Sequence, residues 1–382
     1  MQRYLAAKIK QDLPHKIVLL SGPRQTGKTT LAKQLYSSFD YFNYDVAQDR
    51  VALQRKQWDR DKSLVIFDEL HKQKDWKRWI KGIYDTESIP PQLMVTGSAK
   101  MDTFRQVGDS LAGRYFQYRL HPFDLKEIAQ YSTMNPEQAF ETLWHCSGFP
   151  EPFLKGSPNY YKRWRQSHLN IILKQDLIDL YTISNLKALE TLVLLLQERI
   201  GSNVSYANLA RDLGKDAGTI KRYLEHLESL YIIFRVAPYH SNITRSLLKE
   251  PKYYFYDWTY ARDDGARLEN FVACALLKEL DYIEDTTGTI SRLHFVRTKD
   301  GREIDFLTSF DQKPKQLIEV KYSNSTPSAN FCHFAPQLPG IEQIQLVKNI
   351  DRESSTPEGL KIKALIPWLT YLTLLDPAGH NL

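Results

Sequence analysis

The feature that most constrains this chain lies near its start, between Gly22 and Thr29. The segment reads Gly-Pro-Arg-Gln-Thr-Gly-Lys-Thr, follows the apolar run 17–20 and precedes a helix-like stretch at 30–36. A glycine-rich loop between a strand and a helix lets successive backbone amides and the helix N-terminus point at phosphate groups. The pattern therefore predicts an α/β domain that binds a nucleoside triphosphate.

Each position of this loop has a predicted role. The Lys28 ammonium is expected to reach the β and γ phosphates, and the Thr29 hydroxyl to ligate Mg²⁺. We expect ATP with Mg²⁺ as the ligand. The remaining residues of the predicted nucleotide-binding loop are Gly22, Pro23, Arg24, Gln25, Thr26, Gly27 and Thr30.

Two further apolar runs end in polar residues that suit phosphate chemistry. The run 64–67 ends in Asp68 and Glu69, which places Asp68 to hold magnesium through water and Glu69 to polarise the attacking water. Two carboxylates there indicate hydrolysis. The run 93–95 ends near Ser98, which either senses the water or γ-phosphate or belongs to an ordinary turn.

The order of these motifs resembles that of AAA-type ATPases of bacteria and archaea that carry an uncharacterised, nuclease-like C-terminal region. The resemblance covers nearly the whole chain and includes the Leu-Ala-Gly-Arg segment 111–114. It implies that Arg114 stabilises the transferring phosphate of its own chain or of a neighbouring subunit, with Arg119 as the alternative. Both could instead be solvated arginines beside a strand. A homo-oligomer is therefore one expectation.

The length of 382 residues and the 42% of hydrophobic residues indicate about two or three domains. Alternating apolar runs and helical segments predict a parallel sheet flanked by helices in the first part. The predicted division is a P-loop ATPase domain at 1–135, a helical connector at 136–195, a winged helix-turn-helix at 196–250 and a second, restriction-endonuclease-like α/β domain at 251–382.

Two segments could contact DNA. The stretches 205–214 and 217–224 have the pattern of a helix-turn-helix followed by strands, but residues 211–235 carry five basic against four acidic residues. Packing or self-association is therefore the rival interpretation. The stretch 155–174 is the more basic one, without an acid and interleaved with Tyr160, Tyr161 and Trp164, which suits nucleic acid or a solvated helix face.

The C-terminal part contains two strand-like segments, 302–307 and 316–321, with a carboxylate–lysine pattern. A period of two places Glu319 and Lys321 on one face, and Asp305 can meet them from the neighbouring strand. This arrangement resembles the D-(D/E)xK nuclease superfamily, although Ile304 replaces the usual proline. The resemblance implies that Asp305, Glu319 and Glu269 bind Mg²⁺ or Mn²⁺ and that Lys321 orients or deprotonates water. An exposed sheet face with ordinary ion pairs is the alternative.

The functional prediction is an ATPase whose nucleotide state controls DNA binding and metal-dependent DNA cleavage. The rival is an ATP-dependent scaffold or protein remodeller whose C-terminal domain binds without cleaving. The net charge of 51 − 45 = +6 allows a polyanionic partner. No apolar run has the length of a membrane span, and the three cysteines lie far apart, so we expect a cytoplasmic protein without disulfides, zinc or a membrane partner.

Overall fold

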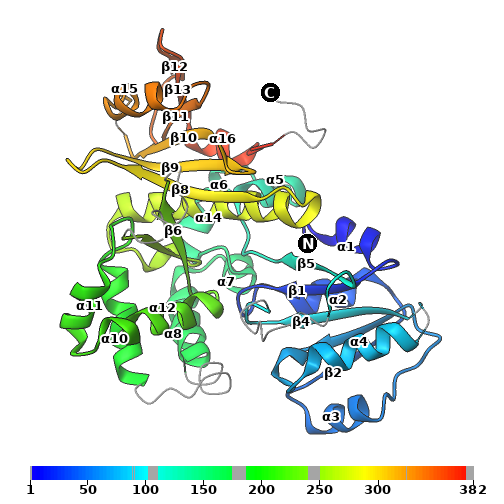
Figure 1. Ribbon diagram of the computed structural model, residues 1–382. Helices are drawn as coiled ribbons and strands as arrows, with labels where there is room; N and C mark the ends of the chain where they lie inside the picture. The colour runs from blue at the N-terminus through cyan, green and yellow to red at the C-terminus, as the bar shows by residue number, and fades with distance from the viewer. Residues whose placement is uncertain are drawn as a thin grey trace.

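The computed structural model describes residues 2–87, 89, 91–101, 111–173, 186–239, 250–323 and 325–375. An N-terminal α/β unit, a group of helices and a larger mixed sheet follow one another along the chain (Figure 1). The two sheets have five and eight strands.

The first sheet is entirely parallel, as the sequence predicts. Its strands are β1 (Ile17–Ser21), β2 (Phe39–Asn43), β3 (Leu64–Asp68), β4 (Gln92–Gly97) and β5 (Tyr115–Arg119), in the order β2-β3-β4-β1-β5. The inner strands β1 and β3 are buried along their whole length, so they read as continuous apolar runs. The edge strands β2 and β5 are partly exposed and mix polar with apolar residues, which is why no run revealed them.

Helices cover both faces of this sheet. They are α1 (Ala6–Asp12), α2 (Lys28–Leu35), α3 (Ala47–Gln54) and α4 (Trp76–Thr86), with the short helix η1 at Leu70–Lys72. Alternate residues of β1 enter two different cores: Val18 and Leu20 pack in one cluster with α1 and α2, whereas Ile17 and Leu19 pack in another with α4. Because the strands are parallel, their carboxyl ends all lie on the same side of the sheet.

The middle of the chain is helical, as expected. Its helices are α5 (Leu125–Tyr131), α6 (Pro136–Cys146), α7 (Pro150–Lys155), α8 (Pro158–Ile171) and α10 (Leu186–Gln197). Lys174, which belongs to the basic stretch, lies outside the described residues.

The expected helix pair follows as α11 (Tyr206–Leu213) and α12 (Ala217–Ser229). Gly214 ends α11 in the left-handed region at φ 59°, and the Asp216 side chain caps α12 by accepting from the Thr219 amide at 2.8 Å. Strand β6 (Ile233–Pro238) begins two residues after the start of the apolar run, because Tyr231 has a left-handed backbone at φ 57°.

The second sheet contains β6, β7 (Lys252–Phe255), β8 (Ser291–Arg297), β9 (Glu303–Phe310), β10 (Lys313–Lys321), β11 (Glu342–Val347), β12 (Ser354–Ser355) and β13 (Leu360–Ala364). Its order is β12-β13-β11-β10-β9-β8-β6-β7. Strands β8, β9 and β10 are antiparallel, whereas β10, β11 and β13 are parallel. Because β6 pairs with β8, this one sheet contains strands from both the predicted 196–250 segment and the predicted 251–382 domain.

Helices also flank this sheet: η3 (Trp258–Tyr260), α14 (Asp264–Thr287), α15 (Asn330–Phe334), η4 (Ala335–Gln337) and α16 (Leu365–Thr370). Helix α14 is longer than the sequence pattern at 268–280 indicates. It packs on β7, β8 and β10 and also contacts β5 of the first sheet (Figure 1). One continuous helix therefore touches both sheets.

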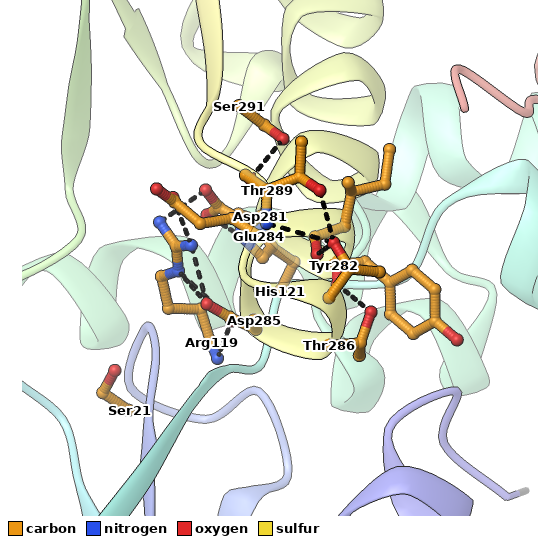
Figure 2. Close-up of polar contacts among 12 residues, drawn as sticks. Ser21, Arg119, His121, Asp281, Tyr282, Glu284, Asp285, Thr286, Thr289 and Ser291 are labelled. Atoms are coloured by element: carbon orange, nitrogen blue, oxygen red, sulfur yellow. Dashed lines mark hydrogen bonds and ion pairs between the residues drawn. The ribbon is translucent and has the colours of Figure 1, made fainter. Parts of the chain in front are cut away.

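The contact between α14 and β5 is made of charged side chains (Figure 2). The Arg119 guanidinium pairs with Asp281 at 2.6 Å, Glu284 at 2.8 Å and Asp285 at 2.7 Å. His121 lies 2.7 Å from the same Asp281 carboxylate. This cluster fixes the last turns of α14 against the edge of the first sheet.

Within the described ranges, no helix combines the length and the apolar character that crossing a membrane requires. The three cysteines are free: Cys146 is buried, Cys274 partly buried and Cys332 exposed.

Candidate functional site

The loop from Gly22 to Gly27 connects the carboxyl end of β1 to the first turn of α2. Gly22 has a φ of 150°, and a Cβ there would lie 2.3 Å from the Leu120 carbonyl oxygen, so only glycine fits. Gly27, at φ 89°, turns the chain into α2. The amides of Lys28, Thr29 and Thr30 then lie in the first helical turn, where backbone N–H groups have no partner within the helix. The loop thus has the predicted form of an anion-binding cradle.

Lys28 directs its ammonium group into this loop. The side chain is buried, and Nζ donates to the carbonyl oxygens of Gly22 at 2.9 Å and Pro23 at 2.7 Å. A buried ammonium is costly without such partners. The ammonium group therefore lies within the loop, bonded to two of its carbonyl oxygens.

The Asp68 carboxylate accepts hydrogen bonds from hydroxyl groups of three different elements. Its Oδ2 accepts from Thr29 Oγ1 at 2.8 Å and from the Tyr41 hydroxyl at 2.7 Å, and its Oδ1 accepts from Thr96. The structure thus brings together the predicted magnesium pair, Thr29 and Asp68, and both offer the hard oxygen ligands that Mg²⁺ prefers. Tyr41 and Thr96 were missed, although the position of Thr96 at the end of a predicted strand was an available signal.

Glu69 lies immediately beyond β3 with a left-handed backbone, at φ 55°. Its amide donates to the Thr96 carbonyl at 2.8 Å, and its Oε2 accepts from Ser98 Oγ at 3.1 Å. Removal from water raises the pKa of Glu69, while the nearby charge of Lys28 acts in the opposite direction. A carboxylate with a raised pKa is a better proton acceptor near neutral pH, so Glu69 and Ser98 form a candidate base and its positioning group.

His71 completes this edge of the site. Its Nε2 lies 3.6 Å from Glu69 Oε2, and the ring is buried. A Cβ on Gly97 would lie 2.5 Å from His71 Nδ1, so the glycine leaves room for the imidazole.

Arg3 binds the loop through its guanidinium group. It could not be predicted from the sequence, because an isolated arginine belongs to no motif. It is 5% exposed and donates to the carbonyl oxygens of Thr26 at 2.5 Å and His121 at 2.6 Å. Its Nε pairs with Glu127 at 2.6 Å, and Glu127 pairs with Lys278 of α14 at 2.6 Å. The phosphate-binding loop is thus linked to the long helix.

Helix α8 contacts the loop from the other side. His168 Nε2 donates to the Arg24 carbonyl oxygen at 3.2 Å, and its ring stacks on Trp164 with centroids 4.3 Å apart. Burial lowers the pKa of His168 to about 4. Of the aromatic residues in the basic stretch, Tyr161 and Trp164 are buried in the fold.

The helix-turn-helix also meets this edge. The Ser21 hydroxyl at the end of β1 lies 2.8 Å from the Tyr231 hydroxyl. The Lys100 amide, two residues after Ser98, donates to the Ser229 carbonyl at 2.8 Å. Hydrogen bonds therefore join strand β1 and the loop after β4 to the end of α12 and the turn that follows it.

Arg114 immediately precedes β5, so it lies at the amino ends of the parallel strands, opposite the carboxyl ends where the loop lies. Its Nε pairs with Asp85 at 2.7 Å. The expected role of Arg114 toward the nucleotide of its own chain was therefore wrong, because the strand direction places it away from the loop. Only a role toward the nucleotide of a neighbouring copy is compatible with this position. Arg119, the alternative, is engaged by the carboxylates of α14.

In the C-terminal sheet, β9 and β10 place Asp305 opposite Glu319, one residue beyond the pair Phe306 and Ile318. Asp305 Oδ2 accepts from the Val320 amide at 2.8 Å, and Lys321 Nζ pairs with Glu319 Oε1 at 2.7 Å. Loss of hydration, followed by the charge of Glu319, raises the pKa of Asp305 to about 7. Glu319 is 3% exposed, and its Oε2 has no hydrogen-bond partner.

The third expected ligand, Glu269, is engaged elsewhere. Its Oε1 accepts from the Tyr254 hydroxyl at 2.5 Å and pairs with Lys252 Nζ at 3.1 Å. Lys252 also pairs with Glu303 at 2.5 Å. Nowhere in the described part of the chain do three or more His, Cys, Asp or Glu side chains form a group able to hold a metal ion. The expected set of three carboxylate ligands is therefore not assembled, because a lysine occupies the Glu269 side.

Comparisons with known proteins bear on each part of the chain. Residues 14–129 match the family model of an AAA domain. Residues 137–261 and 264–367 match two domains of unknown function, DUF8612 and DUF4143. An uncharacterized protein of Mycobacterium tuberculosis is 26% identical over 339 residues, covering 86% of this chain and 75% of the relative. An uncharacterized protein of Methanocaldococcus jannaschii is 24% identical over 350 residues, covering 81% and 75%.

Among solved structures, a RuvB variant of Thermotoga maritima is 18% identical with a TM-score of 0.33, over 61% of this chain and 87% of that one. A STAND protein of Pyrococcus horikoshii is 12% identical with a TM-score of 0.21, and the match covers 74% of this chain and 47% of that protein. The assignment of the first part depends instead on the AAA family match and on the parallel sheet with its phosphate-binding loop. That part is an AAA-type, P-loop ATPase-like domain.

Proposed function

We propose that the chain hydrolyses ATP, with Glu69 as the general base. The observation that carries this proposal is the meeting of Thr29 with Asp68, and of Glu69 with Ser98, at the end of β3 beside the loop. The loop amides and Lys28 bind the β and γ phosphates. Thr29 and Asp68 would hold Mg²⁺, which neutralises charge on the phosphate oxygens. Glu69 accepts the proton of the attacking water while Ser98 fixes its carboxylate.

Two variants separate binding from chemistry. Lys28→Ala should lose binding of a fluorescent ATP analogue, whereas Glu69→Gln should bind it normally and release phosphate at least about 100-fold more slowly. Glu358→Gln, at an exposed position, serves as the control. Wild-type hydrolysis by Glu69→Gln would remove Glu69 from this role.

DNA is the proposed partner, and nucleotide state the proposed control. Helix α8 presents the exposed residues Lys162 and Arg163 on one side and His168 to the loop on the other. The helix-turn-helix, with its exposed residues Lys221 and Arg222 on α12, is bonded to the loop after β4. Both basic elements are thus mechanically attached to the nucleotide site. Mobility-shift titrations with ATP, ADP and a non-hydrolysable analogue should give different DNA affinities; equal affinities in all three would contradict nucleotide control.

Metal-dependent cleavage of that DNA is proposed for the C-terminal domain. Its order of a helix, three antiparallel strands, a helix and a parallel strand supports a restriction-endonuclease-like core. Asp305 and Glu319 would hold the cation, which supplies a polarised water, and Lys321 would orient that water. The double variant Asp305→Ala with Lys321→Ala should lose Mn²⁺-dependent nicking of supercoiled DNA and keep ATP hydrolysis.

A DNA-binding scaffold without cleavage is the second candidate. The position of Lys252 against Glu269 favours it, because a complete three-carboxylate set is not formed. Wild-type protein that shifts DNA but leaves it uncut with ATP, Mg²⁺ and Mn²⁺ would support this candidate.

Assembly into a homo-oligomer would give Arg114 access to the nucleotide of a neighbouring copy. Sedimentation with and without a non-hydrolysable ATP analogue tests this, and a strict monomer in both conditions would exclude a role for Arg114 in hydrolysis.

A further inference from the structure

Lys252 is an unusual residue in the C-terminal sheet. Its side chain is 1% exposed, and lysine is almost never buried to this extent unless it is paired. The ammonium group lies between Glu269 at 3.1 Å and Glu303 at 2.5 Å. It is therefore held between carboxylates of two different elements, α14 and β9.

One oxygen of Glu269 already has two partners. Oε1 is shared by Lys252 and the Tyr254 hydroxyl. Oε2 faces Gly201, where a Cβ would lie only 2.8 Å away. A metal ion could bind Glu269 Oε1 only by displacing Lys252.

In the other half of the cluster, Lys321 pairs with only one oxygen of Glu319, Oε1, at 2.7 Å. Asp305 and Glu319 stand opposite each other on adjacent strands, and the buried Oε2 of Glu319 has no hydrogen-bond partner. A buried carboxylate oxygen without a donor or cation is costly. Mg²⁺ typically binds one or two carboxylates and completes its octahedron with waters and phosphate oxygens, so two carboxylates suffice here.

We propose that Lys252 is a built-in cation that replaces one metal ion of this cluster, and that the cluster binds a single hydrated Mg²⁺ or Mn²⁺ on Asp305 and Glu319. The remaining coordination positions are open to water and to a phosphodiester oxygen. This inference rests on the metal-binding role proposed above for the C-terminal domain. It sets the expected stoichiometry at one ion per chain and removes Glu269 from the ligands.

Calorimetric or paramagnetic-resonance titration of the full-length chain with Mn²⁺ tests the proposal. The titration uses no nucleotide and a Thr29→Ala background, which weakens metal binding at the ATP site. One Mn²⁺ per chain is expected. Asp305→Asn should abolish this binding, whereas Glu269→Gln should change its Kd less than about threefold.

Lys252→Met should raise the stoichiometry from one to two, because Glu269 and Glu303 then lack their cation. Arg297→Met is the matched control, since Arg297 pairs with the same Glu303 at 2.9 Å but from the surface, and one ion is expected. Circular dichroism establishes that each variant folds, and Glu269→Gln keeps the test decisive if Lys252→Met does not fold.

The outcomes separate this inference from the proposed function. Two Mn²⁺ per wild-type chain, or one ion that is lost in Glu269→Gln, would overturn the role of Lys252 while leaving a metal-dependent domain in place. Absence of Mn²⁺ binding by the wild type would overturn both.

Discussion

Arg3 and Glu127 form a buried ion pair beneath the phosphate-binding loop, with 2.6 Å between Nε and Oε1. The same arginine donates to the Thr26 carbonyl, and the same glutamate pairs with Lys278 of α14. The pair therefore fixes three segments that are far apart in the sequence. Its loss affects both the loop and its attachment to the long helix.

Glu127→Gln should destabilise the fold by about 3–5 kcal/mol, because it leaves Arg3 and Lys278 without their shared buried counter-charge. Chemical denaturation with the midpoint and slope both recorded measures this change. The control is Asp85→Asn, which breaks the exposed pair with Arg114 and should change stability little. Equal effects of the two variants would contradict the assigned importance of the buried pair.

His168 should make stability depend on pH in the acidic range. Its pKa is lowered by burial from 6.5 to about 4, so between these values the unfolded chain binds a proton that the folded chain does not. The free energy of unfolding therefore falls as the pH is lowered from about 6.5 to about 4, by on the order of 3 kcal/mol from this group. Denaturation curves at a series of pH values measure the slope.

His168→Gln should flatten that slope while retaining a donor toward the Arg24 carbonyl. Part of the slope should persist, because burial also lowers the pKa of His294 to about 4. A slope that His168→Gln does not alter would mean that the imidazole is protonated equally in both states.

Gly97→Ala should impair hydrolysis and stability together. The added methyl group would lie 2.5 Å from His71 Nδ1, so the ring beside Glu69 must move, at a cost of about 1–3 kcal/mol. Gly82→Ala is the matched control, because no heavy atom lies within 4 Å of a Cβ at this helical position. It should stabilise the protein by up to about 1 kcal/mol and leave hydrolysis unchanged. Thermal unfolding and phosphate release measure both effects.

Lys162→Ala combined with Arg163→Ala should weaken DNA binding at α8. Removing two phosphate contacts should lower the slope of log affinity against log salt by about two. Lys74→Ala, an exposed lysine of the ATPase-like domain, should leave the slope as it is. If the double variant has the wild-type slope, the α8 face does not contact the phosphate backbone.

The parts of the nucleotide site that could be predicted are those in which neighbours in the sequence act together. The loop from Gly22 to Thr29 contains its own donors, and Asp68 and Glu69 follow directly on a buried strand. Parallel strands bring their carboxyl ends to one edge, so a motif at each strand end is enough to predict their meeting. Lys321 beside Glu319 follows equally from the period of two along one strand.

The residues that were missed or misassigned depend on contacts between distant segments. Arg3 and Glu127 are 124 positions apart, and Tyr161 and Trp164 lie in a pattern that does not reveal which side of α8 faces inward. Glu269 was given to a metal because the pattern could not show that Lys252 lies against it.

The sequence by itself therefore determined the phosphate-binding loop, the parallel sheet and the facing pair of Asp305 and Glu319, since short-range spacing and strand periodicity are enough for them. Only the tertiary structure decided the ion-pair partners of the other buried charged side chains, such as Arg3, Glu127 and Glu269. The physical reason is that a buried carboxylate must be matched by a cation or a donor, and packing alone selects whether that partner is a lysine such as Lys252 or a site for a metal ion.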